Sequence, residues 1–280
     1  TGVRIALGGA RVDQPPPVSG LVASGRTDKL DAIEWIGLVQ GGGEGASKMP
    51  LQRIDVTARR LQLLGGVFPD TRLLVLPADG SATAVRAEGD ALQGQLRVPE
   101  SRSAAISGKF ERVHWRSAAV SAPAPATVTA RDGAASPPSM KAPVQVADSD
   151  AIDPAAIPAL SFDIDDLRII DARLGSAKLR TRPTPAGLQV EQFTARAPDQ
   201  SIDVTGSWTG RGTTARTRLS ASLASKDFGS MLDGFGYGGR LAGGKGEARL
   251  DAGWSGSPAD FNVAGLDGSL TVNARDGRLL

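Results

Sequence analysis

The stretch Ala215-Arg216-Thr217-Arg218-Leu219-Ser220-Ala221-Ser222-Leu223 decides the fold class of this chain. Its odd-numbered positions are apolar or small, and its even-numbered positions are charged or hydroxylic. Successive side chains of a β-strand point to opposite faces of a sheet, so the pattern predicts a strand with one apolar and one polar face. Similar runs occur at 160–165, 202–204 and 270–273. We therefore expect a mainly β chain whose sheet has one apolar face.

The composition fits such a sheet and excludes several classes of protein. Hydrophobic residues make up 40% of the 280 residues, a content too high for global disorder. Aromatic residues make up only 4%. The chain has no cysteine, so disulfides and thiolate chemistry are not available. Its 32 basic and 30 acidic residues are mixed along the sequence, without a basic stripe interleaved with aromatics. Nucleic-acid binding is therefore not expected.

The ends of the chain suggest a piece of a longer protein. The sequence begins with Thr1 rather than Met and stops directly after an alternating run. It contains no apolar run of about 18 residues, which a membrane-spanning helix would need. Any signal peptide or membrane anchor is therefore expected outside this piece.

Three segments are expected along the chain. Residues 1–117 form a first β segment, punctuated by turn signals. Residues 118–156 are rich in Pro, Ala and Ser and show no period, which is typical of a flexible insertion. Residues 157–280 return to alternation and form a second β segment.

One or two short helices are expected within these segments. Apolar residues recur at helical spacing over about 31–40, with Asp31 as a candidate cap. A second helix is expected at about 226–233, capped by Ser225.

The two β segments share a spacing of apolar positions. Ile54, Val56, Leu61, Leu63, Phe68 and Leu73 recur, with the same intervals, as Leu160, Phe162, Leu167, Ile169, Leu174 and Leu179. A repeat of this kind suggests a molecule extended along one axis rather than a closed globule.

Two motifs come close to a ligand site without completing one. Residues 239–246 match a phosphate-binding loop except at Gly246, where a Ser or Thr hydroxyl would hold Mg²⁺. Asp148, Asp150 and Asp153 lack the Gly and the terminal Glu of a calcium loop. Neither a metal nor a cofactor is therefore expected.

The remaining candidates for catalysis are also incomplete. Asp163, Asp165 and Asp166 lie on the polar side of an alternating run, without the aromatic sugar platforms of a glycosidase. His114, the only histidine, has no serine elbow to partner it. A structural role is expected for these residues, and an enzyme is not.

Several short motifs follow one another in a fixed order. In the second half they are Asp153-Pro154, Ile157-Pro158-Ala159-Leu160, Leu174-Gly175, Gly206-Ser207-Trp208, Lys226-Asp227-Phe228-Gly229, Phe235-Gly236, Gly253-Trp254-Ser255-Gly256-Ser257-Pro258, Leu266-Asp267-Gly268-Ser269-Leu270 and Asp276-Gly277-Arg278-Leu279. In the first half they are Gly25-Arg26, Leu30-Asp31, Trp35 and Gly94-Gln95-Leu96-Arg97-Val98-Pro99. In this order the chain resembles the AsmA-like family, specifically its long YhdP branch of Gram-negative envelope proteins.

The resemblance implies an elongated, twisted antiparallel β-sheet that curls into an open hydrophobic groove. It also implies the periplasmic part of a bridge-like protein, anchored in the inner membrane, which carries phospholipid between the inner and outer membranes. The implied partners are phospholipid acyl chains and outer-membrane or periplasmic proteins. The family has no catalytic residues to carry over.

The apolar positions of the alternating runs are the candidate lipid-binding residues that would line the groove. They are Ile5, Leu7, Ile54, Val56, Leu61, Leu63, Leu73, Val75, Phe162, Ile164, Leu179, Val190, Ile202, Val204, Leu219, Leu223, Leu270 and Val272. Alternation indicates one covered face but not what covers it. A closed β-scaffold or protein-interaction module of the envelope therefore stays open, as does a polysaccharide-binding β-protein.

Overall fold

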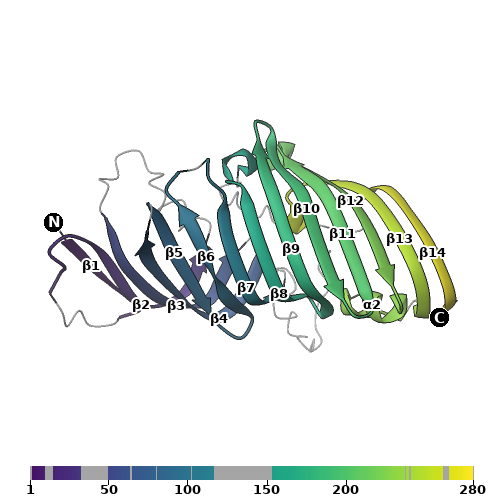
Figure 1. Cartoon of the computed structure of the whole chain (residues 1–280), viewed down its shortest axis with the longest axis horizontal. Helices are drawn as coiled ribbons and strands as arrows, with labels where there is room; N and C mark the ends of the chain where they lie inside the picture. The colour runs from purple at the N-terminus through teal and green to yellow at the C-terminus, as the bar shows by residue number, and fades with distance from the viewer. Residues whose placement is uncertain are drawn as a thin grey trace, which may run out of the picture.

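The computed structural model describes residues 2–9, 15–32, 50–63, 65–79, 81–101, 103–116, 153–236, 238–239, 241–260 and 265–279. These residues form one sheet of 14 strands whose spatial order is the order of the sequence (Figure 1). The strands are β1 (Gly2–Leu7), β2 (Gly20–Asp31), β3 (Leu51–Leu63), β4 (Gly66–Ala78), β5 (Ala82–Glu88), β6 (Leu92–Pro99), β7 (Ile106–Trp115), β8 (Leu160–Ile169), β9 (Ala172–Thr184), β10 (Gly187–Ala197), β11 (Gln200–Thr209), β12 (Arg216–Ser225), β13 (Leu241–Ser255) and β14 (Asp267–Leu279). The expected elongated, mainly β architecture is confirmed.

The sheet consists of two antiparallel meanders, β3–β7 and β8–β14. The pairs β1–β2, β2–β3 and β7–β8 are parallel, which the expectation of an antiparallel sheet did not include. A parallel pair needs a crossover connection rather than a tight turn. Two of these connections run through residues 33–49 and 117–152, outside the described residues.

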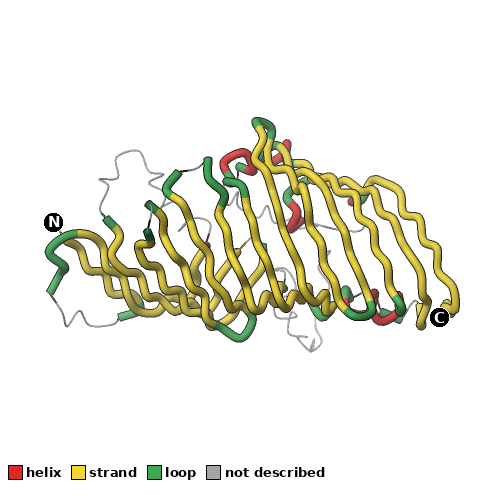
Figure 2. Tube along the Cα trace, in the orientation of Figure 1, coloured by secondary structure: helices red, strands yellow, loops and turns green. Residues whose placement is uncertain are grey.

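The helical elements are short and lie between strands (Figure 2). The 3₁₀ helices are η1 (Pro154–Ala156), η2 (Gly212–Thr214) and η3 (Pro258–Asp260), and the α-helix is α2 (Phe228–Gly234). No helix in the described part of the chain is long and apolar enough to span a membrane.

The two expected helices have different outcomes. A helix does form near 226–233, but Asp227 caps it rather than Ser225, because Asp227 Oδ1 accepts the backbone N–H of Ser230 at 2.9 Å. The helix expected at about 31–40 lies mostly outside the described residues, and Asp31 itself ends β2.

The expected insertion, 118–156, also lies mostly outside the described residues. Its last residues form η1, in which Pro154 is buried. Asp153 Oδ1 accepts the N–H of Ala155 at 3.0 Å and caps this turn. The last residues of the expected insertion thus form a capped turn.

The alternation changes phase once in the first hairpin. Buried residues occupy even positions as far as Ala58 in β3 and then odd positions from Leu61. In β4 the change falls between Phe68 and Thr71, at Asp70, whose φ is 41°. Because both strands change phase at facing positions, the apolar side chains stay on one face of the sheet.

The first hairpin of the second meander carries the same feature. The apolar positions shift between Ile164 and Leu167 in β8, where the pairing register also shifts. In β9 the shift falls between Leu174 and Ala177, next to Gly175 with φ 71°. Such bulges re-aim side chains at the cost of one locally unpaired residue. The two blocks that share an apolar spacing in the sequence thus change phase at corresponding places, although the pairing register shifts only in the second.

The sheet curls, so that parts distant in strand order meet. The N–H of Val67 in β4 donates to the carbonyl of Arg116, directly after β7, at 2.9 Å. The turn between β3 and β4 reaches η3, because a Cβ atom placed on Gly65 would lie 2.3 Å from Cβ of Ala259. The face on the inside of this curl carries the buried hydrophobic clusters.

The opposite face is polar and holds ion pairs between neighbouring strands. Asp55 accepts hydrogen bonds from Arg72 at 2.7 and 2.8 Å and from Arg53 at 2.9 Å. The hydrogen bonds from Arg72, more than any other contact, lower the pKa of Asp55 to about 2.

This depressed pKa predicts a loss of stability in acid. Since the pKa of the Asp55 carboxyl is about 2 in the folded chain and 3.8 without these contacts, its contribution is present above about pH 4 and is lost as the pH falls toward 2. Allowing for solvent screening, we expect about 1 kcal/mol of this acid-dependent stability to disappear in Asp55→Asn. Urea unfolding at a series of pH values measures this contribution. If the free energy of unfolding falls between pH 4 and pH 2 as steeply in the variant as in the native chain, Asp55 is not its source.

Candidate functional site

Strand register places one residue from every strand in a single apolar row across the sheet. This row, called row 1, contains Ile5, Ala23, Ile54, Val75, Val85, Leu96, Gly108, Phe162, Leu179, Phe193, Val204, Ala221, Leu250 and Leu270. No polar side chain interrupts it.

A second row runs beside row 1, and its residue in each strand is two positions away from the row 1 residue of that strand. This row 2 contains Leu7, Gly25, Val56, Leu73, Ala87, Gly94, Phe110, Ile164, Ala177, Ala195, Ile202, Leu223, Ala248 and Val272. Both rows cross the parallel junction between β7 and β8 without a break.

The residues between the two rows point to the other face and are mostly polar. From β2 to β14 they are Ser24, Asp55, Leu74, Arg86, Gln95, Lys109, Asp163, Lys178, Thr194, Asp203, Ser222, Arg249 and Thr271. The sheet is thus two-faced along its whole length, because every strand alternates and the register keeps the alternation in step.

The residues predicted to line a groove lie on this apolar face. Row 1 holds Ile5, Ile54, Val75, Phe162, Leu179, Val204 and Leu270, and row 2 holds Leu7, Val56, Leu73, Ile164, Ile202, Leu223 and Val272. Val190 and Leu219 belong to a third, shorter row, and Leu61 and Leu63 line a cavity described below.

The prediction omitted several members of the two rows. Val85, Leu96, Phe110, Phe193 and Leu250 occupy row positions but were not among the candidate residues. Alternation in their strands was the available signal, since each is flanked by residues of the polar face.

Burial along row 1 divides the apolar face into two parts. Near the N-terminal end Ile54 and Val75 are only 2% and 5% exposed. From β8 onward residues such as Phe162 and Val204 are half-buried, and Leu270 on β14 is 64% exposed. The first part, called the closed part, therefore contains the most buried residues of row 1, although Val85 and Leu96 are half-buried there. In the second part, called the open part, row 1 is mostly half-buried or exposed, while row 2 residues such as Ala195 and Ile202 remain buried.

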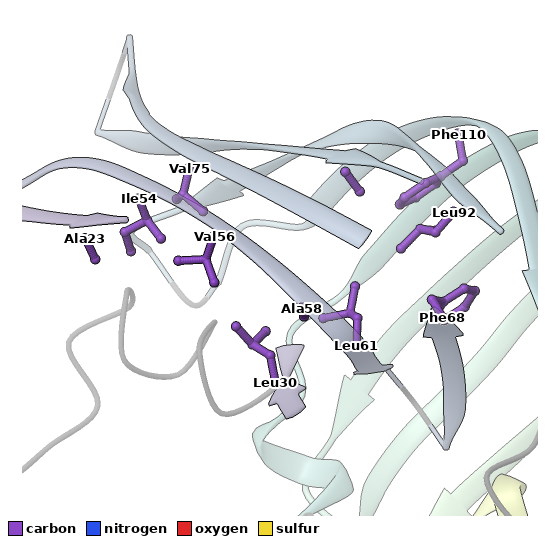
Figure 3. Close-up of a cluster of buried hydrophobic side chains, with 11 residues drawn as sticks. Ala23, Leu30, Ile54, Val56, Ala58, Leu61, Phe68, Val75, Leu92 and Phe110 are labelled. Atoms are coloured by element: carbon purple, nitrogen blue, oxygen red, sulfur yellow. The ribbon is translucent and has the colours of Figure 1, made fainter. Parts of the chain in front are cut away.

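The closed part contains a cavity of about 70 Å³. It is lined by Ala32, directly after β2, and by apolar side chains of β2 to β7, which include Leu30, Val56, Leu73 and Phe110. Figure 3 shows Leu30 and Val56 among the labelled side chains of this cluster, with Phe110 farther along the sheet. A cavity without polar groups stays dry and accepts apolar ligands.

Two smaller clusters cover the strand ends of the open part. The helix α2 lies at the ends of the strands (Figure 1), and its Phe228 and Met231 pack against Ala248 in row 2. At the opposite strand ends Ile157, directly after η1, joins a cluster with Trp208. The half-buried residues of row 1 lie between these two clusters, as a strip with a hydrophobic rim on each side.

The titratable residues singled out in the sequence take part in ion pairs. His114 Nε2 lies 3.0 Å from Asp166 Oδ2, and Arg168 lies 3.1 Å from the same oxygen. Burial raises the pKa of Asp166, but the hydrogen bonds from His114 and Arg168 outweigh it and lower the pKa overall. Asp163 pairs with Arg180 at 3.0 Å.

The incomplete calcium and phosphate-loop motifs lie in ordinary structural elements. Asp153, besides capping η1, lies 3.5 Å from Arg211. Leu241 to Gly246 form the start of β13, paired with β14, and do not lead into a helix as a phosphate-binding loop would. Within the described ranges, no group of three or more His, Cys, Asp or Glu is placed to hold a metal ion.

Comparison with known proteins gives one result that covers nearly the whole chain. No curated protein and no solved structure matches it. A family model described as YhdP protein matches residues 2–280, so both meanders and the crossover between them fall within the match. On this evidence the chain belongs to the YhdP protein family.

Proposed function

We propose that this chain binds phospholipid acyl chains along its apolar face, as the periplasmic part of a bridge-like lipid-transport protein of the Gram-negative envelope. The observation that carries the proposal is the pair of apolar rows that cross all 14 strands without a polar side chain. With strands about 4.8 Å apart, the rows extend roughly 60 Å.

The chemistry of the rows suits a hydrocarbon chain that has to move. Each methylene removed from water gains about 0.8 kcal/mol, so an acyl chain of ordinary length binds well. Successive positions of row 1, such as Leu179, Phe193 and Val204, are all apolar and half-buried, so one place on the strip resembles the next. Sliding along the strip therefore costs little, and a polar head group stays in water at the open side.

Family membership supports this context. In the proposal the chain lies in the periplasm, an inner-membrane anchor is supplied by segments outside it, and outer-membrane or periplasmic proteins are the protein partners. No catalytic role is part of the proposal. The hydrogen-bonded His114 and Asp166 are consistent with a structural role for these groups.

A pair of adjacent substitutions tests the proposal. Val204→Asp places a charge on the apolar face, whereas Thr205→Asp places the same charge on the exposed polar face one residue away. Because a carboxylate next to a hydrocarbon chain is costly to desolvate, Val204→Asp should weaken lipid binding at least about tenfold, while Thr205→Asp leaves it unchanged.

The measurement is native mass spectrometry and gel filtration after incubation with vesicles of phosphatidylethanolamine and phosphatidylglycerol. Circular dichroism establishes that both variants are folded. A native chain that takes up no lipid, or equal uptake by both variants, would overturn the proposal. The first outcome would favour a closed β-scaffold or protein-interaction module of the envelope.

A further inference from the structure

The cavity in the closed part ends abruptly although the apolar rows continue. Among the described residues that line it, the last along the sheet is Phe110 of β7, and none comes from β8 to β14. Rows 1 and 2 nevertheless continue into β8 through Phe162 and Ile164. Something at the junction of β7 and β8 must therefore fill the space above the rows.

Phe110 fills the row positions on its own side of this junction. A Cβ atom on Gly94 would lie 2.7 Å from Cδ1 of the Phe110 ring, and one on Gly108 would lie 3.1 Å from its Cε2. Gly94 is the row 2 neighbour of Phe110, and Gly108 is the row 1 residue of the same strand. The ring thus lies over two positions where the sheet has no side chain.

Phe162 adds a second ring, placed differently. Its ring centroid is 5.5 Å from that of Phe110, and the two ring planes meet at 88°. The two rings therefore pack in a T-shaped, edge-to-face arrangement. Phe162 follows Gly108 in row 1, so the pair of rings spans both rows.

We propose that Phe110 and Phe162 form a wall at the end of the cavity, which makes it a seat for the end of a single acyl chain. Phe162 then sets the longest chain that the seat accepts. This inference rests on the proposed function and deepens it, because it divides the apolar face into a seat of limited length and an open strip. Phe162 is the better residue to change, since it is half-buried whereas Phe110 is 5% exposed.

The test is the dependence of affinity on chain length. Saturated fatty acids of increasing length displace a fluorescent fatty acid from the purified chain. For the native chain, affinity should rise about fourfold per added methylene and then stop rising at a definite length. In Phe162→Ala the rise should continue for at least about two more carbons before it stops, because the Phe110 ring loses the ring packed against it and is free to turn away from the end of the cavity.

Phe193→Ala is the matched control. Phe193 is also a half-buried phenylalanine of row 1, two strands farther on, but it packs against a different hydrophobic cluster from the one around the cavity, which Phe162 contacts. It should leave the cut-off length unchanged. Phe162→Leu provides a milder variant in which the wall is lowered but the core stays filled, and its cut-off should lie between those of the native chain and Phe162→Ala.

The experiment distinguishes failure of the proposed wall from failure of the proposed lipid binding. Binding with the same cut-off in the native chain and in both Phe162 variants, or an equal shift in Phe193→Ala, would overturn the wall while leaving lipid binding intact. No binding of any fatty acid or phospholipid by the native chain would overturn the proposed function and the wall with it.

Discussion

Phe68→Ala is expected to lower the free energy of unfolding by about 3–5 kcal/mol. Phe68 is 1% exposed and faces Leu61 across the first hairpin, inside the hydrophobic cluster of the closed part. Removing the ring leaves a hole that neighbouring strands cannot fill, because backbone pairing holds β3 and β4 in register and closely packed interiors relax only partly. Urea unfolding followed by circular dichroism measures the change.

Leu270→Ala is the control for this prediction. Leu270 lies on the same apolar face but at the β14 edge, where it is 64% exposed. Its truncation should change the free energy of unfolding by less than about 0.5 kcal/mol. Comparable losses in the two variants would contradict the division of the apolar face into a closed core and an open strip.

The second large effect is expected from Gly175→Ala, at about 2–4 kcal/mol of lost stability. Gly175 has φ 71°, a conformation that residues with a Cβ atom adopt only at a cost. The added Cβ would also lie 2.2 Å from the carbonyl oxygen of Arg196 in β10, so the backbone has to move. Thermal and urea unfolding both report the loss.

Gly253→Ala makes the same chemical change at a permissive site. A Cβ atom on Gly253 would meet nothing closer than 3.4 Å. Reduced freedom of the unfolded chain should then raise stability by up to about 1 kcal/mol. A similar loss at both glycines would show that the bulge at Gly175 is not responsible. The two variants together test whether the backbone at position 175 requires glycine, which is a physical reason for the Leu174-Gly175 motif of the family resemblance.

Local pattern was sufficient to predict much of the fold. The run Ala215 to Leu223 lies in β12, apart from its first residue, and alternates between the two faces as its sequence does. The helix near 226–233 followed from its apolar spacing, although the capping residue did not. These features depend on residues a few positions apart, whose preferences are the same wherever the strand lies in the sheet.

The phase of the alternation could not be predicted in the same way. Ile54 and Leu61 were both expected on the apolar face although one is at an even and the other at an odd position of one strand. In a regular strand they would lie on opposite faces. The phase change in β3 reconciles them, and the φ of 41° at the facing phase change in β4, at Asp70, is a conformation that the surrounding sequence does not predict.

The sequence by itself determined that this chain is a sheet with one apolar face, because alternation is a local property of each strand. Only the tertiary structure decided that these faces join into two rows across every strand, that the curl closes one part and leaves the other open, and that Phe110 meets Phe162. Residues 52 positions apart, such as Phe110 and Phe162, come together through a parallel pairing. That pairing depends on the register of whole strands, which no short stretch of sequence contains.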